Sequence, residues 1–254
     1  MCFNIGVSNY IRGICAILSL IRKSKRGPFL HAWNHTGFDG VFSVSFSQYG
    51  EDLALIHLLE QKTGRYLDVG AHHPNRCSNT RLLYDQGWSG VNVEANPNLI
   101  PELKRKRPRD KTICGFVGSH DEYIFHIFKE PAISTANKDW KEKFINEGQS
   151  IESDIRVKGV TLYDLITTNF SSSTLDLLLI DAEGSDFDVL QSGSFEKLAK
   201  NLHPTWVLVE TPGSYRTASE QETIKYLQDF NYEPILFLPM SAILRKQLHK
   251  ASFM

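Results

Sequence analysis

The chain lacks several features that would assign a protein to a class at once. Its four cysteines, Cys2, Cys15, Cys77 and Cys114, form no C-x-x-C pair. We therefore expect neither a zinc site nor a disulfide framework, but reduced thiols in a cytoplasmic protein. The net charge is only −1 over 254 residues. Such a balance gives no bulk electrostatic reason to expect a nucleic-acid partner.

Long hydrophobic runs are also missing. The longest uncharged run near the N-terminus, Gly13–Ile21, is shorter than the ~20 apolar residues that span a bilayer. Residues 1–26 nevertheless carry apolar residues at helical spacing and end in the basic segment Arg22–Arg26. Two interpretations stay open: an amphipathic helix lying on the inner face of an anionic membrane, or a helix packed on the domain or on a partner subunit. The sequence leaves the oligomeric state open.

A dinucleotide fingerprint is the third missing feature. The apolar strand expected at Tyr66–Val69 ends at Gly70, but the further glycines of G-x-G-x-x-G do not follow. Glycine permits an unusual φ and the close approach of a ligand to the backbone, and residues 75–80 offer caps for a helix start. A carboxylate at Asp68 would repel phosphates and attract a cation. The pattern therefore disfavours an NAD- or nucleotide-sugar-linked oxidoreductase.

A second expected strand, Gly90–Val93, ends in the acidic residue Glu94. An acid at this place in a nucleoside-binding α/β fold accepts hydrogen bonds from both ribose hydroxyls. The alternative is that Glu94 is a solvated loop residue and Gly70 only a turn. Because the two features occur at the spacing of consecutive strands, we predict a nucleoside site.

Four short motifs occur in one order along the chain: Ser47–Asp52, Leu67–Ala71, Val93–Pro97 and Leu179–Gly184. In these the chain resembles the FkbM family of S-adenosylmethionine-dependent methyltransferases, over roughly residues 46–247. The resemblance implies S-adenosylmethionine as cofactor and a Rossmann-like class I methyltransferase fold. That fold is an α/β domain with a mostly parallel seven-stranded sheet and helices on both faces. Accordingly, we divide the chain into an N-terminal helix and connector, residues 1–46, and a methyltransferase domain, residues 47–254.

Predicted cofactor contacts come from the motifs and from the expected strand ends. Gln48 and Glu51 are included by resemblance only, because their segment closes over the methionine moiety in the family. Ser119 is included because it follows the strand expected at Thr112–Val117, near the place of an adenine. The full set is Gln48, Glu51, Asp68, Val69, Gly70, Ala71, Glu94, Ala95, Ser119 and Asp181.

Three carboxylates follow two further apolar strands. The strand expected at Leu175–Ile180 leads into Asp181 and Glu183, and the strand at Trp206–Val209 leads into Glu210. We predict that these acids are catalytic, because a hydroxyl acceptor needs a general base and crowding raises carboxyl pKa values toward neutrality. The same oxygens are of the type that Mg²⁺ takes as ligands. We favour the base over the metal and predict no metal site.

The acceptor is defined only by resemblance. It is expected to be an oxygen, in most cases a sugar hydroxyl of a glycan, glycolipid or secondary metabolite, so a small molecule or carbohydrate is the expected partner. A non-catalytic module that keeps the fold and binds the cofactor remains the alternative from another class. The polar segment 129–158 is expected to form an insertion over the carboxyl edge of the sheet. In it, Trp140 and Phe144 either stack on a sugar or form a local core.

Overall fold

A computed structural model describes residues 29–32, 40–211 and 221–247, with side chains from residue 44 onward. The chain divides into two compact units, residues 1–45 and 46–254. In the first unit, β1 (Phe29–Ala32) pairs with β2 (Gly40–Ser43) in an antiparallel hairpin. The helix expected in residues 1–26 lies outside the described residues. None of the described helices is both long and apolar enough to cross a membrane.

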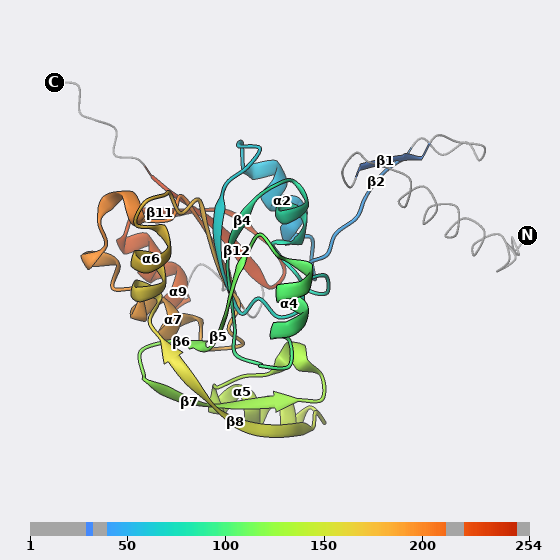
Figure 1. Ribbon diagram of the computed structural model, residues 1–254, viewed down its shortest axis with the longest axis vertical. Coiled ribbons are helices and arrows are strands. Elements are labelled where there is room, and N and C mark those ends of the chain that lie inside the picture. Colours follow the sequence, from blue (N-terminus) through green and yellow to red (C-terminus); the bar gives the residue numbers. More distant parts are fainter. Residues whose placement is uncertain (1–28, 33–39, 212–220, 248–254) are drawn as a thin grey trace, which may run out of the picture. The chain divides into compact units, whose positions relative to one another are not determined.

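The second unit is built on a seven-stranded sheet (Figure 1). Every neighbouring pair is parallel except those that involve β12, which runs antiparallel to both of its neighbours. This arrangement confirms the predicted Rossmann-like, mostly parallel fold. In spatial order the strands are β11 (Tyr232–Phe237), β12 (Ser241–Lys246), β10 (Trp206–Glu210), β9 (Leu177–Ile180), β3 (Arg65–Val69), β4 (Ser89–Glu94) and β5 (Lys111–Cys114).

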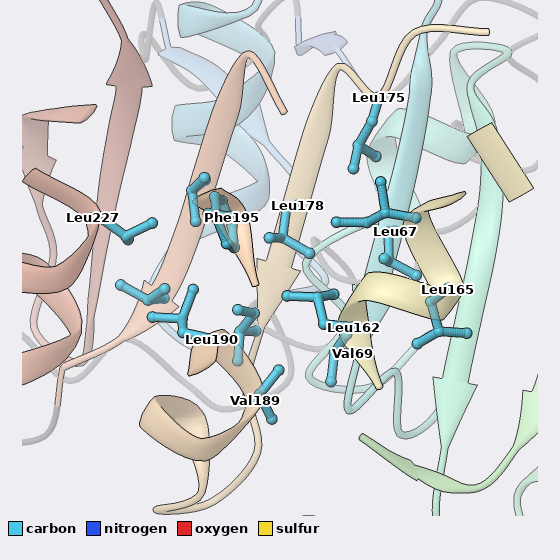
Figure 2. Close-up of a cluster of buried hydrophobic side chains, with 14 of the residues drawn as sticks. Leu67, Val69, Leu162, Leu165, Leu175, Leu178, Val189, Leu190, Phe195 and Leu227 are labelled. Carbon is cyan, nitrogen blue, oxygen red and sulfur yellow. The ribbon is translucent and has the colours of Figure 1, made fainter. Parts of the chain in front are cut away.

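Helices cover both faces of this sheet. In Figure 1, α6 (Leu162–Phe170), α7 (Asp186–Ser192) and α9 (Glu222–Asp229) lie on one side, and α2 (Glu51–Leu58) and α4 (Ile100–Lys106) lie on the other. The first group buries its apolar residues against alternate positions of the strands, as Figure 2 shows for Leu67, Val69, Leu178, Leu165 and Leu190. Side chains at the other alternate positions belong to a second buried cluster, which includes Tyr66, Leu177 and Leu179. Strand β9 is thus buried on both faces, which explains its continuous apolar sequence.

The order of the strands reverses between β3 and β9. From β3 the chain adds β4 and β5 on one side, and it later returns to place β9 on the other. Ligands of open α/β sheets bind at the carboxyl ends of the strands at such a switch point. Gly70 lies here with a φ of 80°, and an added Cβ would collide with the backbone carbonyl of Asp181 after β9. A ligand was expected to lie close to the backbone of Gly70, but it is the backbone after the neighbouring strand β9 that lies there.

Two local expectations were wrong. The helix expected to open within residues 75–80 begins only at Arg81, as α3 (Arg81–Asp85), because those residues form a loop held by buried hydrogen bonds. The strand expected at Thr112–Val117 divides after β5, and its last part, β6 (Phe116–Val117), joins a second sheet. That sheet has the order β6–β8–β7.

The segment 129–158, which was expected to form an insertion, contains helix α5 (Lys138–Asn146) and most of strand β8 (Ile151–Val160), while the other strands of the second sheet precede it. Strand β8 pairs with β7 (Glu122–Phe128) in an antiparallel ladder. Helix α5 begins at Asn137, whose side chain accepts hydrogen bonds from the first backbone N–H groups. Phe144 of α5 packs edge-on against Phe128 of β7, with ring centroids 5.8 Å apart. The remaining short elements are the 3₁₀ turns η1 (Pro131–Ile133), η2 (Phe195–Lys197) and η3 (Lys200–Leu202).

Candidate functional site

A cavity of about 460 Å³ lies at the carboxyl edge of the main sheet. Its wall contains Gly70 after β3, Glu94 at the end of β4, Asp181 after β9 and Glu210 at the end of β10. The volume falls within the ~300–1,000 Å³ that is usual for small-molecule sites. The switch point of the sheet therefore carries a ligand-sized cavity whose wall is formed by the ends of four strands.

Most of the predicted site residues line this cavity. Glu51 lines a smaller adjoining cavity of about 40 Å³ instead. Asp68, Ala71 and Ser119 line neither cavity among the residues described. The predicted residues on the wall of the larger cavity are Gln48, Val69, Gly70, Glu94, Ala95, Asp181, Glu183 and Glu210.

Asp68 lies beneath the cavity and not in its wall. Its carboxylate accepts a hydrogen bond of 2.7 Å from the hydroxyl of Thr80, which in turn accepts one of 3.1 Å from the guanidinium of Arg107. Burial raises the pKa of Asp68 to about 6. Asp68 thus supports the loop after Gly70 through side-chain contacts, and the sequence alone did not indicate these partners.

Ser119 also has a local partner. Its hydroxyl donates a hydrogen bond of 2.7 Å to Asp188, and the residue is exposed. Because the chain leaves the main sheet at Gly115, Phe116 and Val117 form the wall near Glu94. Ser119, predicted to lie near an adenine, does not line the cavity, whereas these two residues do. Ala71 is buried and its N–H donates to the carbonyl of Val93, which keeps it off the wall.

Glu94 is buried at the tip of β4 and accepts one backbone hydrogen bond on each oxygen. The N–H of His72 donates to one oxygen at 2.8 Å, and that of Asn96 donates to the other at 2.7 Å. Burial nevertheless raises the pKa of Glu94 to about 7. Each carboxylate oxygen keeps a second lone pair. The side chain is therefore held rigidly and can still accept two hydrogen bonds from a diol in the cavity.

His72 follows the turn at Gly70 and lines the cavity. It takes a φ of 47°, and its buried Nε2 has no hydrogen-bond partner in the described part of the chain. Burial and the nearby Arg76 lower the pKa of His72 to about 4. The imidazole in the cavity wall is therefore neutral at physiological pH, and an unsatisfied buried nitrogen of this kind can pair with a bound ligand.

The three acids predicted to be catalytic do come together, and Asp186 lies close to them. Burial raises the pKa of Asp181, Glu183, Asp186 and Glu210, and repulsion from the neighbouring carboxylates raises each further. Lys143 offsets this only in part for Glu183 and Glu210. The cluster therefore retains protons near neutral pH while the cavity holds no cationic ligand.

Helix α5 contributes a further part of the cavity wall, and no helix was predicted there from the sequence. Trp140, Lys143 and Phe144 line the cavity. The indole of Trp140 lies against Gly184, so closely that an added Cβ there would collide with it. Asn137 donates a hydrogen bond of 2.8 Å to the carbonyl of Gly184. The insertion thus fixes the loop that carries the acids. Of its two aromatic rings, Phe144 is core and Trp140 is half-buried at the cavity.

The remaining wall residues were not predicted. Cys77 and Met240 line both cavities, whereas Arg76 and Glu130 line only the larger one, where they form a two-pronged ion pair of 2.8 Å. Arg76 is therefore already neutralised, which leaves Lys143 as the other cation among the described wall residues. Glu130 is likewise paired, so the acids left in the wall are Glu94, Asp181, Glu183 and Glu210. This charge balance suits a cationic nucleoside better than a diphosphate.

Comparison with known proteins gives two kinds of result. No curated protein sequence matches the chain at a significant level. Several solved structures are similar to the chain at low identity. The TehB-like SAM-dependent methyltransferase from Corynebacterium glutamicum matches at 11% identity and a TM-score of 0.38, covering 94% of this chain and 97% of that one. A human methyltransferase 10 domain containing protein matches at 11% identity and a TM-score of 0.41, covering 92% and 96%.

The family comparison is more specific. The sequence profile described as the Methyltransferase FkbM domain matches residues 68–234, more than half of the chain. The matched region contains Gly70, Glu94, Asp181 and Glu210, which lie together in the cavity wall. By this match, on a seven-stranded Rossmann-like sheet, the chain belongs to the FkbM methyltransferase family and is an S-adenosylmethionine-dependent methyltransferase.

Proposed function

We propose that the enzyme methylates a hydroxyl group of a sugar in a glycan, glycolipid or secondary metabolite. The observation that carries this proposal is the environment of the Asp181 carboxyl group. Its carboxyl lies at the switch point, lines the cavity and accepts no hydrogen bond from the described residues. Burial and the nearby Asp68 and Glu51 raise its pKa. A carboxylate with a pKa raised toward neutrality suits the removal of a hydroxyl proton.

The cavity residues fit the cofactor at two points. Glu94 has two free acceptor positions for the ribose hydroxyls, and the uncompensated acids near Asp181 favour the positively charged end. When bound, S-adenosylmethionine supplies a methyl group on a sulfonium centre. The chain's own residues must then hold the acceptor oxygen in line with that group, and such positioning contributes ~7–11 kcal/mol to comparable reactions.

A flat wall next to the acids supports a sugar as the acceptor. Trp140 is half-buried and exposes part of its indole to the cavity, and Phe144 holds it edge-on with ring centroids 5.4 Å apart. Aromatic rings present an apolar face while the neighbouring carboxyl groups accept or donate hydrogen bonds. A ring that carries several hydroxyl groups matches both surfaces.

A single substitution tests the base. In Asp181→Asn we expect kcat to fall by ~10²–10⁴-fold, the usual contribution of a positioned base, with the affinity for S-adenosylhomocysteine changed much less. The matched control is Asp176→Asn at the opposite end of the same strand, where the side chain accepts a hydrogen bond from the N–H of Arg65. Full turnover by Asp181→Asn would remove Asp181 as the base. Calorimetry that finds tight binding of NAD and none of S-adenosylmethionine would overturn the site itself.

We also propose a cytoplasmic location with peripheral contact to the inner face of a membrane through residues 1–26. The support is their helical spacing of apolar residues and the basic segment that follows. Flotation on liposomes with anionic lipid should recover the full chain at the top of the gradient and leave a chain without residues 1–26 at the bottom. Equal recovery of the two would rule the contact out.

A further inference from the structure

The loop after β9 has an unusual backbone. Glu183 has a φ of 47° and Gly184 a φ of 87°, so two consecutive residues take the left-handed conformation. For a residue with a Cβ this conformation is strained, and it persists only where the surrounding structure holds it. The contacts that hold Glu183 in this turn therefore help to determine where the carboxyl groups of Glu183 and Asp181 lie.

Two side chains of the insertion hold this turn by its carbonyl groups. The hydroxyl of Thr135 donates a hydrogen bond of 2.8 Å to the carbonyl of Glu183, and the side-chain amide of Asn137 donates one of 2.8 Å to the carbonyl of Gly184. We call Thr135 and Asn137 the turn clamp. Neither residue lines either cavity, so the clamp acts from behind the wall.

The second sheet fixes the position of Thr135. The residue is fully buried, and its backbone N–H and carbonyl exchange hydrogen bonds of 3.1 and 2.8 Å with His126 of β7. Its hydroxyl also accepts a hydrogen bond of 2.9 Å from the N–H of Asn137. Thr135 is therefore held by contacts that do not involve the turn.

Asn137 joins the turn to helix α5. Its side-chain oxygen accepts hydrogen bonds of 3.0 and 3.1 Å from the N–H groups of Asp139 and Trp140, while its side-chain nitrogen donates to Gly184. Two donors face one end of the amide and an acceptor faces the other, so only one orientation of the amide satisfies all three. One side chain thus caps the helix and holds the turn.

We propose that Thr135 and Asn137 are positioning residues, which hold the acids of the turn close to the positively charged end of the methyl donor. The inference rests on the part of the proposed function that puts this end near Asp181, and not on the identity of the acceptor.

The affinity for a charged ligand reports the distance of the acids from it. When a carboxylate moves from about 4 to about 5 Å from a unit positive charge, binding weakens about fourfold at an effective dielectric constant of about 20. S-adenosylmethionine carries a positive charge at sulfur, and S-adenosylhomocysteine does not. The ratio of the two affinities therefore measures the placement of the acids without an acceptor.

The experiment measures the Kd of both ligands by calorimetry on the full chain. Asn137→Ser keeps an oxygen that caps the helix but has no donor for Gly184. In this variant the affinity for S-adenosylmethionine relative to S-adenosylhomocysteine should fall about fourfold. Thr135→Val removes the other donor and should lower the ratio in the same way. Thr135→Ser retains the hydroxyl and should keep the ratio of the wild type.

The matched control is Thr161→Ala. Thr161 caps α6, where its hydroxyl accepts a hydrogen bond from the N–H of Asp164, and no residue of α6 lines either cavity. Loss of this cap should lower the Tm by about 2–4 °C and leave the ratio unchanged. The control thus separates a loss of stability from a displacement of charge.

An unchanged ratio in Asn137→Ser, or the same fall in Thr161→Ala, would overturn the proposal. An equal loss of affinity for both ligands leaves the ratio unchanged and counts against it too. Should Thr135→Val fail to fold, Asn137→Ser still decides the question. Failure of the inference appears in the ratio, whereas failure of the proposed base appears in the turnover of Asp181→Asn, so the two are distinguishable.

Discussion

Two groups of buried ionisable side chains meet strand β3, and they differ in whether the charges have partners. Beneath the cavity, the guanidinium of Arg107 donates hydrogen bonds to the carbonyl of Pro74 and the hydroxyl of Ser78 at 2.9 and 2.8 Å. It donates a third to Thr80 at 3.1 Å and lies 3.7 Å from Asp110. Arg107 is 1% exposed. Here opposite charge and hydrogen bonds compensate the guanidinium at both terminal nitrogens, and only its Nε has no partner in the described residues.

At the carboxyl edge of the same sheet, Asp181, Glu183 and Glu210 form the opposite case. They are like charges, and burial with mutual repulsion raises the pKa of each. Partnered buried groups fix one conformation, whereas unpartnered ones persist where a ligand completes them. The difference assigns the Arg107 group to the architecture of the loop and the acid group to binding and chemistry.

The largest effect should follow from breaking the compensated group. Arg107→Met removes the guanidinium that donates to Pro74, Ser78 and Thr80, and the loss of one partner from a buried ionic group lowers the free energy of unfolding by about 3–5 kcal/mol. Denaturant titration measures it. Arg105→Met is the matched control, since Arg105 lies on the adjacent helix end and its side chain is 64% exposed. A change of the same size in both variants would mean that burial does not set the effect.

The second prediction concerns the pH dependence of stability, in which the buried acids and His72 act in opposite directions. The pKa of Glu94 is raised from its ordinary value of 4.5 to about 7 by burial, so the folded state holds this proton more tightly than the unfolded state. Its contribution to stability is therefore lost as the pH rises through the window between those values. His72, with a pKa lowered to about 4, contributes in the opposite direction below its ordinary value of 6.5.

The substitution Glu94→Gln should therefore make the loss of stability with rising pH less steep. Between pH 5 and 8 the unliganded enzyme should lose more unfolding free energy than the variant does, by about 2–3 kcal/mol. Urea titrations at pH 5 and pH 8 measure how much unfolding free energy each protein loses between them. A hydrogen bond that glutamine fails to make lowers the stability of the variant equally at both pH values, so it cancels from this comparison. Glu122→Gln, at a side chain 55% exposed, serves as the control with an unchanged slope. An equally steep decline in Glu94→Gln would show that this carboxyl is not the buried acid that titrates.

The sequence predicted the main sheet and the ends of its strands because these have a physical signature. Parallel strands buried on both faces are continuously apolar, so the acid that ends each one is conspicuous, as with Asp181 and Glu94. The sequence did not predict side-chain contacts between residues that are far apart along the chain. No pattern near Asp68 indicates that the hydroxyl of Thr80 will donate a hydrogen bond to its carboxylate and accept one from the guanidinium of Arg107. Nothing before Ser119 shows that the chain changes sheets at Gly115.

One missed element did carry a signal. Strand β8 lies largely in the polar segment 129–158, for which no strand was predicted, yet Ile155 and Val157 alternate there with Arg156 and Lys158, which is the period of a half-exposed strand. The high charge of the segment concealed this alternation. Its consequence is functional, since β8 and β7 support α5, and α5 brings Trp140 and Lys143 to the cavity.

The smallest effect is expected where the charges are paired but exposed. Arg76 and Glu130 make an ion pair of 2.8 Å across the cavity rim, with side chains 56% and 40% exposed. Exposed pairs of this kind contribute ~0.2–1 kcal/mol, because water already solvates both charges. A double-mutant cycle with Arg76→Gln and Glu130→Gln isolates the coupling from the separate hydrogen bond that Glu130 accepts from Ala132.

We expect that coupling to stay below about 1 kcal/mol and to shrink further in high salt. A coupling as large as the loss in Arg107→Met would break the comparison, because pairing alone, and not pairing under burial, would then determine stability. A small coupling would sharpen it. The rim pair would be free to open for an entering ligand at little cost in fold stability, while the Arg107 group beneath it keeps the loop of residues 74–80 in place.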